Sequence, residues 1–203
     1  MNPQRFINDT VKPWDELNSL LRENFAFQPD LSDITRLAGG IAVSIRHQVD
    51  FSSLDDKQAN ESCTAHRIIA DAGDYWKHGN LRKEERNSPI TVSAAFEFSE
   101  LLGFRFVRNM ICVEHKSLGA HDFMETSATA IKFWLNQHNI NINWQGVVLE
   151  SESHFEPTAR LGFNPKYCTS VSSVRLRFLK NNSDSTYTPV DPPEVKFEVY
   201  DYS

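Results

Sequence analysis

The chain has few cysteines, and none of them belongs to a C-x-x-C motif. Cys63, Cys112 and Cys168 are odd in number and far apart. This pattern predicts neither a disulfide framework nor a zinc site, and it is typical of proteins in a reducing cytoplasm. Long apolar runs are also missing, because the longest, Leu37–Ile45, is far shorter than the ~20 residues that span a bilayer. We therefore expect a cytoplasmic protein that is not embedded in a membrane.

Positive charge is scarce as well. The sequence has 21 Lys and Arg against 27 Asp and Glu, a net charge of -6. This balance argues against broad DNA binding, which needs clustered positive charge, but it leaves open a local basic groove for RNA. The motifs of common hydrolases, NTPases, dinucleotide-binding enzymes and zinc proteases are absent, and no cofactor is expected.

Apolar residues recur at helical spacing through the first half of the chain. They predict helices over residues 13–25, from a cap at Asp30 or Ser32 to residue 49, and over residues 54–78. Gly39 and Gly40 in the second of these helices would cost about 1 kcal/mol each in helix propensity. We interpret them as allowing another helix to approach closely, with a functional kink as the alternative. A further helix begins near Asp122, which starts a capping-box-like pattern with Glu125, and continues to residue 138.

Residues that alternate in character predict the strands. Residues 90–98 and 104–114 form a predicted hairpin, and residues 147–150, 171–179 and 195–200 alternate at a period of two. The predicted fold class is therefore α+β. We expect an N-terminal helical bundle with an inserted β-hairpin over residues 1–140, and a C-terminal antiparallel sheet over residues 141–203.

The strongest candidate site lies where the helix predicted over 54–78 ends. Asp71, Asp74, Lys77 and His78 are placed within about two helical turns, just before a stop at Gly79. This cluster is a candidate binding site. The structural interpretation is that Asp74 fixes the His78 imidazole, which in turn caps the helix C-terminus.

A metal site on the same helix is a weaker interpretation. His66, Asp74 and His78 share one stripe of the helix, and a histidine and a carboxylate four residues apart can hold a metal ion. No second cluster completes a ligand set, although His121 and Glu125 form another such pair. We therefore predict no metal site, and a metal-dependent hydrolase is the third functional alternative.

The Asp71, Asp74, Lys77, His78 and Leu81 pattern also carries a resemblance. Together with the hairpin and a helix containing Ile131–Trp134, it resembles small uncharacterised bacterial proteins related to the HEPN (higher eukaryotes and prokaryotes nucleotide-binding) group. The resemblance covers residues 55–138. It implies a helical bundle and a role in bacterial or phage conflict systems, including antiphage defence. Many members of that group are inactive binding modules.

The active members of that group are metal-independent RNases with an Arg, a polar residue and a His. Arg108, Asn109 and His115 have this form, with six residues between Arg108 and His115. The resemblance then implies that His115 acts on the 2′-hydroxyl and that Arg108 stabilises charge on the phosphate. The family carries this motif on a helix, whereas this segment is predicted to be a strand, which would place Arg108 and His115 on opposite faces.

Taken together, the sequence favours an intracellular binding or regulatory protein. The alternative is the metal-independent RNase. We expect a protein partner or self-association at the C-terminal sheet, because Val195–Tyr200 follows Pro192 and Pro193 and is predicted to be an edge strand. An edge strand offers unpaired backbone groups to a partner strand.

Overall fold

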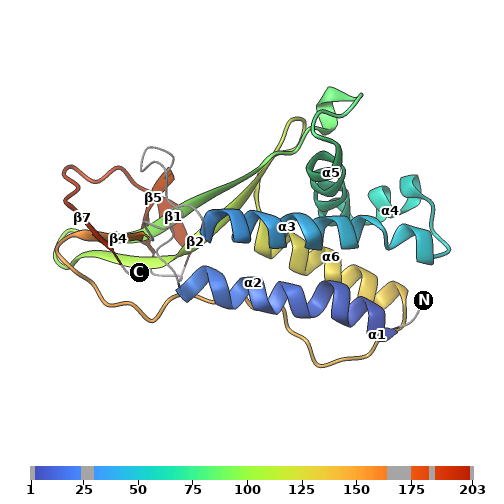
Figure 1. Cartoon of the computed structure of the whole chain (residues 1–203), viewed down its shortest axis with the longest axis horizontal. Helices are drawn as coiled ribbons and strands as arrows, with labels where there is room; N and C mark the ends of the chain where they lie inside the picture. Colours follow the sequence, from blue (N-terminus) through green and yellow to red (C-terminus); the bar gives the residue numbers. More distant parts are fainter. Residues whose placement is uncertain (1–2, 24–29, 164–174, 183–185, 202–203) are drawn as a thin grey trace. The chain divides into compact units, whose positions relative to one another are not determined.

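The chain folds into two compact units, each assembled from separate segments. The computed structural model describes residues 3–23, 30–163, 175–182 and 186–201 (Figure 1). Unit 1 consists of Met1–Asn18, Thr35–Thr91 and Ile111–Val148. Unit 2 consists of Ser19–Ile34, Val92–Met110 and Leu149–Ser203. Helices and strands are both abundant, which confirms the α+β class.

The first helical run begins earlier than predicted. Helix α1 (Pro3–Phe6), the π-helical turn η1 (Ile7–Val11) and helix α2 (Lys12–Glu23) follow one another without a break, whereas the prediction opened the helix at Pro13. In the widened turn, the Lys12 N–H bonds to the Ile7 carbonyl, five residues back. Because Pro13 has no N–H to donate, a widened turn just before it lets the helix continue. Phe25, the predicted last apolar residue, lies outside the described residues.

Two glycines let helices α3 and α5 approach closely. Helix α3 spans Asp30–Arg46, and the short 3-10 helix η2 spans Val49–Phe51. A Cβ on Gly39 would collide with the Trp76 ring, and one on Gly73 would lie 2.7 Å from the Ala42 carbonyl oxygen. The prediction that glycine permits a close helix approach is therefore confirmed for Gly39. A Cβ on Gly40 would meet nothing within 4 Å.

The single helix predicted over residues 54–78 is wrong, because the structure has two helices there. Helix α4 spans Asp56–Ser62 and helix α5 spans Thr64–His78. Between them Cys63 is extended, with φ -146, and its Sγ accepts the His66 N–H. No glycine or proline marks this break, which occurs because Cys63 ends one helix and caps the next. The predicted end at Gly79 is confirmed: its φ is 73, and its N–H bonds to the Tyr75 carbonyl.

The chain continues with a β-hairpin, whose strands contribute residues to both units, and with the last elements of unit 1. Strands β1 (Ile90–Ser99) and β2 (Gly103–His115) are neighbours, which confirms the hairpin, and β3 (Gly119–Asp122) pairs antiparallel with the end of β2. Helix α6 (Phe123–Gln137) packs against α5, and the Asp122 carboxylate caps it by accepting the Glu125 N–H. The largest fully buried side chains of this unit are Phe6, Trp14, Leu17, Ile41, Ile45, Ile69, Ile111, Phe123 and Trp134.

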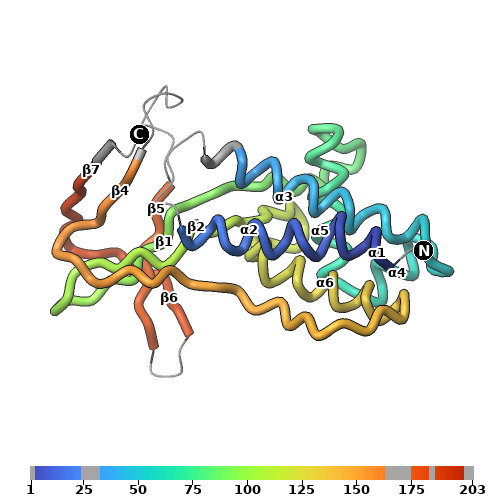
Figure 2. Tube along the Cα trace, turned by 60° about the horizontal axis from the view of Figure 1, so that its bottom comes forward, coloured from blue at the N-terminus to red at the C-terminus, as the bar shows by residue number. Residues whose placement is uncertain are grey.

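In unit 2 the C-terminal strands join the hairpin. Strand β5 (Arg175–Asn181) pairs parallel with β1, β6 (Tyr187–Pro189) pairs antiparallel with β5, and β4 (Ala159–Phe163) pairs parallel with β7 (Phe197–Asp201) (Figure 2). The strand orders are β3-β2-β1-β5-β6 and β4-β7. The prediction of a separate antiparallel C-terminal sheet is therefore wrong, because both kinds of pairing occur and β5 extends the hairpin.

Two details of the predicted C-terminal strands also need correction. Residues 147–150 form no strand, and the Val147 carbonyl accepts a hydrogen bond from the Asn18 side chain. Strand β4 was not predicted. Residues 171–174 of a predicted strand, and Cys168, lie outside the described residues.

A candidate binding site on helix α5

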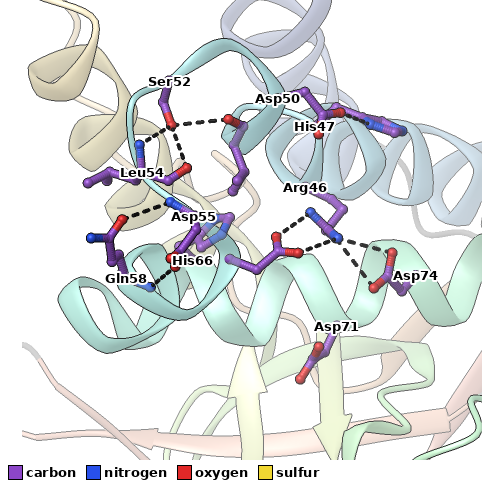
Figure 3. Close-up of polar contacts among 12 residues, drawn as sticks. Arg46, His47, Asp50, Ser52, Leu54, Asp55, Gln58, His66, Asp71 and Asp74 are labelled. Atoms are coloured by element: carbon purple, nitrogen blue, oxygen red, sulfur yellow. Dashed lines mark hydrogen bonds and ion pairs between the residues drawn. The ribbon is translucent and has the colours of Figure 1, made fainter.

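Asp71 and Asp74 on α5 belong to a chain of ion pairs. The Arg86 Nε donates to Asp71 Oδ1 at 2.7 Å, and its Nη2 donates to Asp74 Oδ2 at 2.7 Å. Arg46 at the end of α3 donates through Nε to the same Asp74 and binds Asp56 through both terminal nitrogens, at 2.9 and 3.3 Å (Figure 3). Burial alone would lower the pKa of Arg86, but the hydrogen bonds and charges of Asp71 and Asp74 outweigh it and raise that pKa.

The Asp71 carboxylate also binds His115, and the hydrogen bonds of this imidazole show which ring nitrogen carries its proton. His115 is 2% exposed, and its Nε2 lies 3.1 Å from Asp71 Oδ2. Its Nδ1 accepts the backbone N–H groups of Ser117 and Leu118, at 3.3 and 3.2 Å. A nitrogen that accepts two N–H groups carries no proton, so the imidazole is neutral with its proton on Nε2, donated to Asp71.

This arrangement gives His115 a structural role. The Ser117 hydroxyl lies 3.4 Å from Nδ1, so the three side chains look superficially like a Ser-His-Asp set. A general base needs a free lone pair for the hydroxyl proton. Here the single Nδ1 lone pair is already shared by two backbone donors, so His115 orders the turn between β2 and β3.

His66 lies in the core of unit 1 and does not form a metal stripe with Asp74 and His78. It is 1% exposed, and its Nδ1 accepts the Trp134 indole N–H at 3.1 Å. Burial, aided by the charge of Arg46, lowers its pKa to about 4. The imidazole is therefore neutral at pH 7, with its proton on Nε2. Among the described residues, no group of three or more His, Cys, Asp or Glu side chains is arranged to hold a metal ion.

Of the four residues in the predicted cluster, the structure brings Asp71 and Asp74 into the ion-pair chain. Asp71 is buried and Asp74 is half-buried, whereas Lys77 and His78 are exposed on the last turn of α5. The carboxylate of Asp74 accepts hydrogen bonds from Arg46 and Arg86. The structure therefore shows Asp74 held by arginines, in place of the predicted contact that fixes the His78 imidazole.

The predicted RNase residues do not converge within one chain. Arg108 and Asn109 are buried, and they lie seven and six positions before His115 on strand β2, whose predicted strand character is confirmed. Seven positions of an extended strand cover about 23 Å, more than an arginine and a histidine side chain can bridge. His115 is in addition bound to Asp71.

A cavity of about 620 Å³ opens beside the ion-pair chain. It is lined by five cationic side chains and by three acidic ones, together with His66 and neighbouring polar residues. The cations are Arg46, Lys57, Arg67, Lys83 and Arg86; the acids are Asp56, Glu61 and Asp71. In a protein whose net charge is -6, this cavity carries a local excess of positive charge.

Comparison with protein families, curated proteins and solved structures finds no match to this chain. Its function must therefore be inferred from the chemistry of its side chains. No helix among the described residues is long and apolar enough to cross a membrane.

Sequence reasoning missed Arg46, Asp56 and Arg86, which complete the site. They are distant from Asp71 in the chain, so no local spacing links them. The one signal was the charged loop 82–86, which follows the predicted helix end directly and contains Arg86. An arginine next to two helix carboxylates is a reasonable candidate for an ion pair.

A second polar network, in unit 2, is internally satisfied. Arg105 donates to Glu97 at 2.6 Å, to Glu150 at 3.0 Å and to the Tyr187 hydroxyl at 2.8 Å. Burial, reinforced by the charge of Glu150, raises the pKa of Tyr187 to about 12. Tyr187 thus stays a neutral donor to Glu150, and the network holds strands together.

Proposed function

We propose that the chain is a binding protein that holds a small phosphate-bearing ligand in the α5 cavity. The observation that supports this proposal is that some cations lining the cavity have no acidic partner among the described residues. Arg67 and Lys83 line the cavity, and neither forms an ion pair within the described part of the chain. The Nη1 of Arg86 likewise has no hydrogen-bond acceptor there, since Asp71 and Asp74 take Nε and Nη2.

The acidic residues orient the donors of this cavity. A guanidinium held on two sides by carboxylates has a fixed direction, so its remaining N–H groups point one way at little entropic cost. Several fixed donors with a modest positive excess suit the oxygens of a phosphate group.

The size of the site favours a small molecule over a nucleic acid strand. A cavity of about 620 Å³ falls within the usual range for small-ligand sites. Strand binding instead requires an extended basic groove with aromatic platforms, and the overall charge of -6 works against it. Because both His115 nitrogens are occupied, the network supports binding without catalysis.

Calorimetric titration of the whole protein tests this proposal. We expect ADP to bind and adenosine, which has the same base and sugar without phosphate, to bind at least roughly tenfold more weakly. The double variant Arg67→Ala with Lys83→Ala should lose ADP affinity by roughly tenfold or more, since each charge-assisted hydrogen bond is worth ~1.5–3 kcal/mol. Lys132→Ala, which removes an exposed cation on α6, is the control.

Two results would contradict the proposal. Equal affinity for ADP and adenosine would show that phosphate is not recognised. Unchanged ADP affinity in the double variant would place the phosphate elsewhere. A role in bacterial or phage conflict systems stays a prediction of the HEPN resemblance, and a binding module without catalysis agrees with it.

A further inference from the structure

A second cavity, in unit 2, has a different chemistry. Its volume is about 520 Å³, and three phenylalanines from β1 and β2 form its apolar part: Phe96, Phe104 and Phe106. These rings belong to the aromatic face of the sheet, which packs on Ala159 and Leu161. The aromatic part of the cavity is therefore anchored in a packed core.

A backbone contact fixes the wall of this cavity. The N–H of Phe104 donates to the Glu156 carbonyl at 2.7 Å, and the N–H of Glu156 donates to the Phe104 carbonyl at 2.8 Å. The neighbouring Gly103 has φ 91, and a Cβ there would collide with the Glu156 carbonyl oxygen. Only glycine satisfies both conditions without strain, so the wall residues are held against the strand.

The rim of the cavity carries an excess of negative charge. Arg160 donates through Nε to Glu198 at 3.0 Å, and its Nη1 lies 3.8 Å from Glu156. One guanidinium thus faces two carboxylates, all three of which line the cavity. The hydroxyl groups of Ser153 and Thr158 and the imidazole of His154 also line the cavity.

We propose that this cavity binds a small cationic aromatic molecule. The buried phenylalanine rings form an apolar floor against which the ring of a ligand can pack, and the carboxylate in excess over Arg160 attracts a protonated amine. An anionic ligand would meet repulsion at the same rim. This specificity is opposite to that of the α5 cavity, and the proposal does not depend on the function proposed for that cavity.

Three indole compounds test the charge preference on one ring system. Tryptamine is a cation, indole is neutral and indole-3-acetate is an anion, and binding to the whole protein can be followed by ligand-observed NMR at ~1 mM. We expect tryptamine to bind most tightly and indole-3-acetate most weakly. Absence of tryptamine binding, or equal binding of all three compounds, would overturn the proposal.

A matched pair of variants locates the site. Glu198→Gln should weaken tryptamine binding about fivefold, leave indole unchanged and strengthen indole-3-acetate binding. Glu194→Gln makes the same charge change four residues earlier, where the side chain is paired with Lys196 outside the cavity, and should have no effect. If both variants weaken tryptamine binding equally, the long-range field of the protein is responsible and the proposed site is wrong.

Discussion

Acid should destabilise this protein through His66, and the size of the effect follows from its surroundings. Burial and the nearby Arg46 charge lower the pKa of the folded-state imidazole to about 4, whereas Asp56 and Asp71 oppose that shift. In the unfolded chain the same group has an ordinary pKa of about 6.5. As the pH falls from 6.5 towards 4, the unfolded state therefore takes up a proton that the folded state does not. Stability is complete above pH 6.5 and is lost through this window.

The expected loss can be calculated from the two pKa values. At about pH 5 the unfolded imidazole is almost fully protonated and the folded one almost neutral, which amounts to about 2 kcal/mol in the free energy of unfolding. Urea unfolding of wild type and His66→Gln at several pH values between about 7.5 and 5 measures this term. Subtracting one protein from the other removes the titration of the carboxylates that both share.

We chose glutamine because its side-chain oxygen can still accept the Trp134 indole N–H. The difference in unfolding free energy between the two proteins should change by about 2 kcal/mol over this pH range. His78→Gln, at the exposed end of the same helix, should run parallel to wild type. If His66→Gln also runs parallel to wild type, the imidazole is not held neutral by burial and our account of its environment is refuted.

Three further predictions concern the Arg86 ion pairs, the turn at Gly103 and the last strand, β7. Arg86→Ala should lower the free energy of unfolding in urea by about 2 kcal/mol, because it removes a partner of the buried Asp71. Arg5→Ala, which breaks an exposed ion pair, should lower it by under ~0.5 kcal/mol. Equal losses in the two variants would contradict the proposed network. Gly103→Ala should lower stability by about 1–3 kcal/mol through strain at its positive φ, and a neutral result would mean that the Glu156 wall shifts freely. Deletion of residues 194–203 removes β7 and should abolish self-association or partner binding; size-exclusion chromatography showing an unchanged assembly would reject an interface there.

Local patterns predicted the elements whose residues are close in sequence. The hairpin, the helix after Asp122 and the stop at Gly79 all depend on spacing within a few residues, and all three are confirmed. The break at Cys63 escaped prediction, because an extended residue between two helices needs no glycine or proline. Strand β4 escaped for a related reason: it is short, and its pairing with β7 depends on residues almost forty positions later.

The candidate site was predicted only in part, because its partners are brought together by tertiary structure. Asp71 and Asp74 share one helix, so their spacing is visible in the sequence. Arg46 and Arg86 reach them from other elements, and His115 reaches Asp71 from the end of β2. Conversely, Lys77 and His78 fit the helical spacing but are exposed, since α5 turns that side of its last turn outwards.

The interleaving of the two units has a consequence for how the protein is made. Unit 2 contains segments from near the beginning, the middle and the end of the chain, so no single cut releases it intact. During synthesis from the N-terminus, all residues of unit 1 have been translated once Val148 is added. Strand β1, in contrast, pairs in parallel with β5, which is translated later. The aromatic face of the hairpin is thus left without its later partners while the ribosome adds the residues that follow Val148. A nascent chain paused at that stage is the species most prone to aggregate and the one for which a chaperone matters most.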